Sequence, residues 1–358
     1  MAAPVSKFLF LLILTFLALN YNANGEIHGK TQRKISRANR YGPYLGIVIP
    51  NQFELNPLLQ HPSYTPHDTI DFAGRRFRFG SIAGQRVVMV MTGLSLINAG
   101  ITTQLLLSLF RIKGVVHYGL SGNADPSLHI GDVTIPQSWG HTGLWSWQRF
   151  GFGPEDELPL EAAGDYSREF GYLKFADYAV NVTGCDQNDN LLNNIWYQQE
   201  EIFPIDGTPE ERQHILWVPV DAKYFDLASK LEGKGLELQK CINSTTCLFT
   251  TPKVARIARG ASSSIYLDNS AYRTFLNNKF NVSPVDMESA AVALICYQQR
   301  VPFIIIRALS DLAGGGSAQS NEADTFIPLA ANNSVTVLVE FVKLLNGNDS
   351  TQSEEFSL

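Results

Sequence analysis

The chain of 358 residues has few cysteines and no excess of positive charge. It carries 28 Lys and Arg against 34 Asp and Glu, which gives a formal net charge of −6. Proteins that coat DNA or RNA neutralise its phosphates with Lys and Arg, so this balance argues against a nucleic-acid-binding protein. A hydrophobic fraction of 45% with 17% charged residues argues against a disordered chain and predicts a globular fold.

The four cysteines predict little cross-linking and no metal centre. Cys296 lies in an apolar helical stretch, where a buried free thiol is the simplest interpretation. Cys241 and Cys247 flank a short loop and could close a small ring, whereas Cys185 could pair with either of them. We therefore expect one disulfide among these three. None of the four has the spacing of zinc ligands, so we expect no metal site.

The N-terminal residues have the pattern of a targeting signal. Lys7 precedes an uninterrupted apolar run from Phe8 to Leu19, which is shorter than the roughly 20 residues that span a bilayer. Small residues at Ala23 and Gly25 fit a cleavage site, so residues 1–25 are predicted to be a secretory signal peptide, with a signal anchor as the alternative. We expect no later membrane span, and a mature protein that is extracellular or vacuolar.

Asn-X-Ser/Thr sequons support entry into the secretory pathway. They begin at Asn181, Asn243, Asn281, Asn332 and Asn348. Each pattern is weak alone because it arises by chance. Five of them behind a signal peptide predict that some carry N-linked glycans.

Apolar runs alternate with helical stretches along most of the chain, which predicts an α/β fold. The runs are nearly continuous, as in strands covered on both faces. They are Tyr44–Pro50, Arg86–Gly93, Gly114–Leu120, Gly131–Pro136, His214–Val220 and Val301–Leu309, and the helical stretches are Ile97–Leu109 and Met287–Gln299. We expect a single three-layer α/β/α domain over residues 44–345 with a central mixed, largely parallel sheet.

The remaining segments have a different composition. Residues 26–43 are basic and polar and predict a loosely held N-terminal arm, and residues 346–358 predict a polar tail. Residues 138–212 are rich in aromatic residues, Gly and acids. We interpret them as an insertion over one end of the sheet. The insertion could be a lid, or it could be a segment that packs against the fold and has no function. Both interpretations stay open.

Two acids border the most distinctive segment, residues 285–317. Glu288 stands where an apolar helix begins, and Asp311 ends a buried strand next to Gly314, Gly315 and Gly316. Ligands of open α/β sheets bind beyond the carboxyl ends of strands. Each acid alone also fits a structural role, Glu288 in the first turn of a helix and Asp311 as a turn cap.

This segment resembles the superfamily of purine nucleoside phosphorylases and methylthioadenosine/adenosylhomocysteine nucleosidases. The resemblance rests on Val285–Ala291 (VDMESAA) and Arg307–Asp311 (RALSD). Further similar stretches, in the same order as in the family, are Leu45–Leu59, Thr92–Ser95, Gly119–Gly122, Gly131–Val133 and Gly260–Asn269. The signal peptide and the HYGLSGNADPSL stretch are similar to the secreted plant branch, which contains bark and vegetative storage proteins and cytokinin-riboside phosphorylases. The resemblance implies a nucleoside phosphorylase-like fold, a homo-oligomer and no cofactor.

The resemblance implies two catalytic acids. Breaking an N-glycosidic bond requires a proton or hydrogen bond for the leaving base and a grip on the ribose as positive charge develops. Asp311 corresponds to the residue that serves purine N7, oriented by Ser310, and burial would need to raise its pKa. Glu288 corresponds to the acceptor of the ribose hydroxyls.

Further residues of the implied substrate site lie in the other similar stretches. Met287 would pack under the ribose and Tyr266 would stack on the base, although both also fit an ordinary core. Ser121 and Gly122 complete the expected substrate contacts.

The residues expected to bind phosphate depart from the family pattern. The phosphorolytic members usually place an Arg where this chain has Glu54, another where it has His117, and a Ser where it has Leu120. A carboxylate at Glu54 would repel phosphate and resembles the acid that activates water in the hydrolytic members. Other side chains could bind phosphate instead. They are His117, Ser121, Thr92, Ser95, Arg75, Arg76 and Arg78. The arginines also fit a solvated strand face.

Three functions follow. The first is phosphorolysis of adenosine-like or N6-substituted (cytokinin) ribosides to base and ribose 1-phosphate, with inorganic phosphate as co-substrate. The second is hydrolysis of the same small-molecule nucleosides to free ribose. The third is a storage glycoprotein with little activity, which is disfavoured because Glu288 and Asp311 are both present.

Overall fold

The computed structural model describes residues 29–147, 172–174, 194–205, 208–315 and 322–355. The predicted signal peptide lies outside these residues. The chain divides into two units, Met1–Gly42 and Pro43–Leu358. In the first unit, the segment expected to be a loose arm forms the helix α2 (Gly29–Tyr41), which has no acid in its first turn and ends with Arg40 in its last.

The second unit contains all other described elements. Its strands are β1 (Tyr44–Ile49), β2 (Tyr64–Phe72), β3 (Arg75–Ile82), β4 (Gln85–Met91), β5 (Ile112–Asn123), β6 (Val133–His141), β7 (Trp145–Trp147), β8 (Tyr172–Lys174), β9 (Asn194–Tyr197), β10 (Glu200–Ile202), β11 (Gln213–Ile215), β12 (Trp217–Pro219), β13 (Val254–Ser262), β14 (Val282–Asp286) and β15 (Phe303–Leu312). Its helices are α3 (Gln52–Gln60), α4 (Leu96–Leu109), α5 (Ala222–Glu232), α6 (Ser270–Phe280), α7 (Ser289–Gln298) and α8 (Glu322–Glu355).

The main sheet closes on itself at one end. Its strand order is β12-β6-β13-β14-β5-β1-β4-β3-β2, and β15 pairs with both β5 and β6. The pairings β6–β13, β13–β14, β14–β5, β5–β15 and β15–β6 therefore form a ring, so the core is barrel-like. Within this ring every strand pairs on both edges, and β12 extends from β6 outside the ring.

This topology corrects part of the predicted fold. The α/β class and the mixed sheet are confirmed, but the sheet is not largely parallel. The parallel pairings are β1–β4, β1–β5, β5–β15, β6–β13 and β13–β14, and the antiparallel ones, equal in number, are β5–β14, β6–β12, β6–β15 and the two of the β2–β3–β4 meander. The simple three-layer arrangement also fails, because β15 joins two strands that an open sheet would keep apart.

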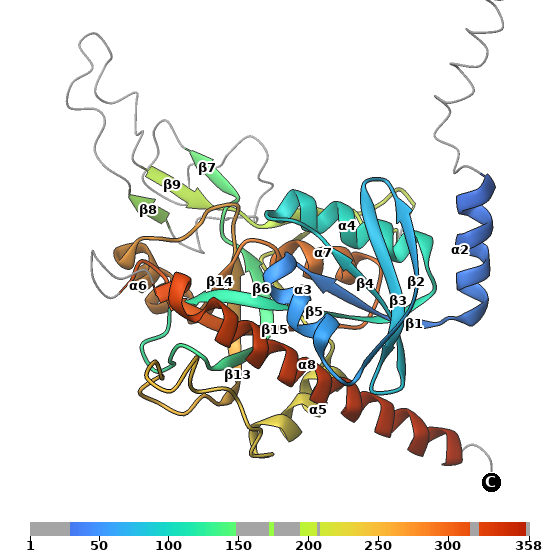
Figure 1. Ribbon diagram of the computed structural model, residues 1–358. Helices are drawn as coiled ribbons and strands as arrows, with labels where there is room; N and C mark the ends of the chain where they lie inside the picture. The colour runs from blue at the N-terminus through green and yellow to red at the C-terminus, as the bar shows by residue number, and fades with distance from the viewer. Residues whose placement is uncertain (1–28, 148–171, 175–193, 206–207, 316–321, 356–358) are drawn as a thin grey trace, which may run out of the picture. The chain divides into compact units, whose positions relative to one another are not determined.

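Five of the six continuous apolar runs form strands of the main sheet, as predicted. The run His214–Val220 is the exception, because it divides between β11 and β12, which belong to different sheets. All six residues of β1 are buried, as are the first eight of β15. The predicted helices correspond to α4 and α7. Figure 1 shows α8 lying along the strands, and it contacts β15, β5 and β6. This packing places one hydrophobic core beneath the carboxyl ends of β1, β5 and β15.

Helix α8 differs from the expectation in two ways. It continues to Glu355, so most of the segment expected to be a polar tail is helical. Within it, residues 324–347 are also long and apolar enough to cross a membrane, although the sequence indicated no later span. Core side chains such as Leu338 and Phe341 are fully buried against the strands, which accounts for this apolar composition.

The cysteine expectation is confirmed for the described residues. Cys241 and Cys247 form a disulfide with an S–S distance of 2.08 Å, and Cys296 is a buried free thiol. Cys185 lies outside the described residues. Of the predicted insertion 138–212, the first four residues belong to β6, and short strands form two small sheets, β7-β9-β8 and β10-β11.

Truncating a fully buried side chain in β15 tests the location of the core. We expect Ile306→Ala to lower the free energy of unfolding by about 2–5 kcal/mol, because it leaves a cavity among side chains that cannot fully collapse. Ile205, which is 90% exposed, provides the matched control, and Ile205→Ala should leave stability nearly unchanged. Urea unfolding measures both. Equal midpoints for the two variants would contradict the assignment of β15 to the core.

Candidate active site

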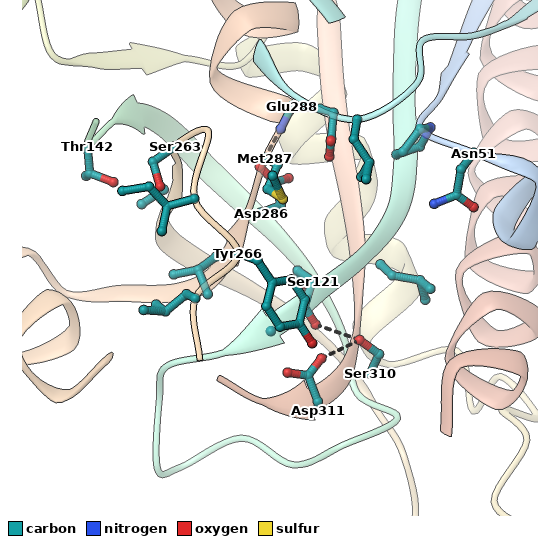
Figure 2. Close-up of a pocket in the computed structure, with 18 of the residues that line it drawn as sticks. Asn51, Ser121, Thr142, Ser263, Tyr266, Asp286, Met287, Glu288, Ser310 and Asp311 are labelled. Atoms are coloured by element: carbon teal, nitrogen blue, oxygen red, sulfur yellow. Dashed lines mark hydrogen bonds between the residues drawn. The ribbon is translucent and has the colours of Figure 1, made fainter. Parts of the chain in front are cut away.

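A cavity of about 430 Å³ opens at the carboxyl ends of β5, β14 and β15. Its volume lies within the range of roughly 300–1,000 Å³ that is typical of small-molecule sites. In Figure 2, Glu288 and Asp311 lie on opposite sides of this cavity and the ring of Tyr266 lies between them. Most of the wall is apolar, so the few polar groups decide what the cavity binds.

Glu54 enters the cavity because of how α3 begins. Asn51 is the N-cap of α3, and its Oδ1 accepts a hydrogen bond from the backbone N–H of Phe53 at 2.7 Å. In return, Glu54 Oε2 accepts from the Asn51 N–H at 3.1 Å, which completes a capping box. Its Oε1 accepts from the Leu120 N–H at 3.3 Å. These bonds hold the carboxyl against β5, where it is 2% exposed.

The burial of Glu54 changes its chemistry. Loss of water around the carboxyl raises its pKa to about 7, and the nearby Arg307 guanidinium opposes this shift only in part. A group with a pKa near neutrality can both accept and return a proton at physiological pH. Glu54 therefore has the properties of a general base.

Glu288 lies at the junction between β14 and α7. Its Oε1 accepts a hydrogen bond from the Ser95 N–H at 3.0 Å, and its Oε2 lies 3.8 Å from Arg307 Nη2. Burial, followed by the charge of the neighbouring Asp286, raises the pKa of Glu288. The loop that supplies the Ser95 N–H is strained, because Ser95 has φ of 88°.

Arg307 is the cation that holds these acids together. It is fully buried, and its Nε lies 2.7 Å from Asp286 Oδ2. The same guanidinium donates to Ser289 Oγ from Nε and Nη2, at 3.0 and 2.9 Å, and from Nη1 to the Leu120 carbonyl at 3.3 Å. These bonds link β15 to β5 and to the first residue of α7 beneath the cavity.

Asp286 is satisfied by several donors besides Arg307. Its Oδ1 accepts from Ser262 Oγ at 2.5 Å and from the backbone N–H groups of Glu288 and Ser289 at 3.2 and 3.1 Å. Ser262 Oγ in turn accepts from the Ala290 N–H at 2.9 Å. This network fixes the turn that presents Glu288 to the cavity.

Asp311 reaches the cavity because β15 is irregular. In the β15–β5 register Leu309 pairs with Ser121 and Asp311 with Gly122, so Ser310 is an extra residue in a β-bulge. A bulge redirects the side chains that follow it. Ser310 Oγ donates to Asp311 Oδ1 at 2.6 Å and lies 3.3 Å from the Ser121 carbonyl. Figure 2 shows both hydrogen bonds.

The cavity brings together the residues that the sequence predicted for catalysis and substrate binding. They are Asp311, Glu288, Met287, Ser310, Tyr266, Glu54, Ser121 and Gly122, and all eight line it. The roles implied for them remain predictions. Their convergence from five segments of the chain excludes the alternative in which the two acids face separate apolar layers.

The predicted phosphate ligands, apart from Ser121, do not line this cavity. Arg75, Arg76 and Arg78 border a second depression with Thr92 and Gly93. Arg75 donates to Thr102 and Asn98, and Arg76 pairs with Asp71 at 2.7 Å. Ser95 donates its backbone N–H to Glu288 Oε1.

His117 is also withdrawn from the cavity. It is fully buried, its Nδ1 bonds the Val48 carbonyl at 2.9 Å, and its Nε2 contacts Arg307. A carbonyl can only accept, so Nδ1 carries the proton and Nε2 accepts from the guanidinium. Burial and the Arg307 charge hold the pKa of His117 well below its usual value. A neutral imidazole with both nitrogens engaged is not placed to bind phosphate.

Sequence reasoning missed Arg307 and Asp286 as functional residues, although both lie in the two quoted motifs. The available signal was a single charged residue inside the apolar run Val301–Leu309. A buried Arg needs carboxylate partners, which directs attention to acids in neighbouring strands. Among the described residues, no group of three or more His, Cys, Asp or Glu is arranged to hold a metal ion.

Removal of Arg307 should be the most damaging single change at the site. We expect Arg307→Met to lower the free energy of unfolding by about 3–5 kcal/mol, because it leaves Asp286 and Glu288 buried without a counter-charge. Arg76→Met, which breaks an exposed ion pair, is the control and should not shift the urea midpoint measurably. Similar midpoints for both variants would show that the buried cation does not hold the site.

Comparisons with known proteins agree with this arrangement. The model of the phosphorylase superfamily matches residues 44–343. Bark storage protein A of Populus deltoides is 31% identical over 280 residues, which cover 77% of this chain and 82% of the relative. The 5'-methylthioadenosine/S-adenosylhomocysteine nucleosidase of Listeria welshimeri is 27% identical over 281 residues, covering 78% and 91%.

Solved structures show the same fold at lower identity. Futalosine hydrolase of Helicobacter pylori has a TM-score of 0.56 and 16% identity, covering 84% of this chain and 97% of the other. The nucleosidase of Neisseria meningitidis in complex with methylthio-immucillin-A has a TM-score of 0.56 and 20% identity, covering 84% and 98%. With a family model over most of the chain and a relative above 30% identity, this chain belongs to the phosphorylase superfamily, whose nucleosidases and phosphorylases cleave glycosidic bonds.

Proposed function

We propose that the chain hydrolyses the N-glycosidic bond of purine-type ribonucleosides and releases the base and free ribose. The observation that carries this proposal is the position of Glu54, a carboxyl with a pKa of about 7 inside the cavity. No Lys, Arg or His is among the described residues that line the cavity. Such a cavity favours water over phosphate as the nucleophile that attacks the ribose.

Each acid has a separate task in this reaction. Glu54 takes a proton from a water molecule as the water oxygen bonds to the anomeric carbon of the ribose. The bond from that carbon to the base breaks, and its electron pair leaves with the base. Asp311 supplies a proton or hydrogen bond to the departing heterocycle, while Glu288 accepts hydrogen bonds from the ribose hydroxyls.

Phosphorolysis is the less favourable alternative on electrostatic grounds. A phosphate ion would enter a cavity lined by Glu54, Asp286, Glu288 and Asp311. Arg307 lies beneath these acids, fully buried and engaged with Asp286 and Ser289. One guanidinium that already pairs with Asp286 and does not line the cavity would not offset the repulsion of an anion by several carboxyl groups in a desolvated site.

The cavity is lined by further residues besides the acids. In Figure 2 Thr142 and Ser263 lie on the side away from Asn51. The cavity is also lined by Leu276 and Tyr272. The apolar surfaces of Leu276 and Tyr272 support a base with an apolar substituent, such as an N6-substituted adenosine, as substrate.

The similarity to the bark storage proteins favours a second candidate, a storage protein with little activity. Such a protein would keep the fold without needing the acids to converge. The retention of Glu54, Glu288 and Asp311 around one cavity supports an enzyme instead.

Product analysis tests the proposal. With adenosine or isopentenyladenosine as substrate, we expect free ribose at a rate that does not depend on inorganic phosphate. Glu54→Gln and Asp311→Asn should each lower kcat/KM by about 10²–10⁴, the typical contribution of one proton-transfer group. Glu340→Gln, at a surface acid bonded to Lys343, is the matched control and should retain activity.

The other possible products would each indicate a different function. Ribose 1-phosphate that forms only with phosphate present would establish phosphorolysis. A folded protein without turnover on either riboside would leave the storage candidate.

The pH dependence tests the role of Glu54 separately. A carboxyl accepts a proton only when ionised, so kcat/KM should rise as pH increases through about 7 and fall below it. Glu54 and Glu288 interact, so the midpoint is an apparent value for the pair. In Glu54→Gln this acid limb should disappear from the residual activity, and an unchanged limb would assign it to another group.

A further inference from the structure

The disulfide between Cys241 and Cys247 closes a short ring in the connection between α5 and β13. Within the ring, the Ile242 N–H donates to the Thr246 carbonyl at 2.9 Å, so the ring is a tight turn. Asn243, Ser244 and Thr245, which form one of the five sequons, occupy this turn and are all exposed. The ring therefore presents an Asn-X-Thr sequence on a fixed, protruding backbone.

The side chain of Asn243 is oriented by its own turn. Its Oδ1 accepts from the Thr245 N–H at 2.9 Å, from Thr245 Oγ1 at 2.9 Å and from the Thr246 N–H at 2.7 Å. Because the carboxamide is planar, fixing Oδ1 toward the turn directs Nδ2 away from it. Among the described residues, none accepts a hydrogen bond from Nδ2, so the atom that carries an N-linked sugar is free.

A second sequon close to the ring stem has the opposite arrangement. Asn332 Nδ2 donates to Gln239 Oε1 at 2.8 Å, and Gln239 Nε2 donates to the Cys241 carbonyl at 2.8 Å. The amide of Asn332 thus supports the stem of the ring. The hydroxyl of its sequon, on Ser334, is fully buried and donates to the Ala331 carbonyl.

The sequon at Asn281 is also used by the fold. Asn281 ends α6 in the left-handed region, with φ of 55°. Its hydroxyl residue, Ser283, is 3% exposed and donates to Asp125 Oδ2 at 2.9 Å. The side chains of the remaining two sequon asparagines, Asn181 and Asn348, lie outside the described residues.

We propose that Asn243 is a site of N-linked glycosylation. The donor is an oligosaccharide linked to a lipid diphosphate. A bond forms between Nδ2 and the first sugar's anomeric carbon, that carbon's bond to the diphosphate oxygen breaks with its electron pair leaving on the diphosphate, and Nδ2 loses one proton. The proposal depends on the secretory entry predicted from residues 1–25, and not on the proposed enzymatic activity.

Exposed apolar side chains beside the ring give the glycan a physical role. Ile242 is 36% exposed and Phe249, two residues past the ring, is fully exposed. A sugar on Asn243 adds polar bulk next to them and would keep this surface soluble.

Peptide mass spectrometry of the full chain, expressed in plant cells and recovered after secretion, tests the proposal. We expect the Asn243 peptide to carry a glycan and the chain to start after the predicted leader. Thr245→Ala should abolish this glycan while Asn243 itself is retained, and Thr245→Ser should restore it. Ser244→Ala, which changes the middle residue of the same sequon and retains Asn243 and Thr245, is the matched control and should leave the Asn243 glycopeptide in place.

Two results would overturn the proposal. One is a chain with its leader removed and Asn243 unmodified. The other is a chain that retains its leader and carries no glycan at Asn243. Because the same preparations can be assayed for nucleoside cleavage, loss of the glycan and loss of activity are separate readouts.

Discussion

The buried guanidinium of Arg307 is the interaction on which the site depends. It lies in the closed part of the sheet and contacts groups from β14, β5 and the start of α7. Without a cation there, Asp286 and Glu288 could not both remain next to each other in a desolvated core. The geometry of the turn that presents Glu288 thus depends on a charge that itself never reaches the cavity wall.

Barrel closure explains how Arg307 can reach all of these groups. β15 pairs with β5 on one edge and β6 on the other, so the middle of β15 is enclosed on every side. The bulge at Ser310 then breaks the regular alternation at the strand's end and turns Asp311 toward the ligand space. Regular pairing holds the cation in the core, and one irregular residue places the acid at the surface of the cavity.

Much of this arrangement could be predicted from local sequence, and the failures have physical causes. The continuous apolar runs of β1 and β15 identify buried strands, and the motif around Glu288 identifies the turn. Nothing local indicates that β15 pairs with β6 or that β14 runs antiparallel to β5, because such pairings depend on contacts between distant segments.

Individual side chains also differ in whether their positions could be predicted from the sequence. Asn51 and Glu54 have the spacing of a capping box, so the position of Glu54 near a helix start was available from sequence. His117 was expected to bind phosphate because it stands where the phosphorolytic family members usually have an Arg. Its side chain points into the core, where Arg307 and the Val48 carbonyl occupy both ring nitrogens.

The balance of charge at the cavity connects these features to the chemistry. Burial raises the pKa of both Glu54 and Glu288 to about 7, and the one buried guanidinium opposes this shift only in part, so each is partly protonated near neutral pH. Positive charge that develops on a ribose ring would restore this compensation in the transition state. A phosphate anion would instead add to the imbalance before any bond breaks. The excess of carboxylates therefore favours a ribose that becomes cationic in the transition state. In the proposed hydrolysis it also favours a neutral nucleophile, such as water, over an anion.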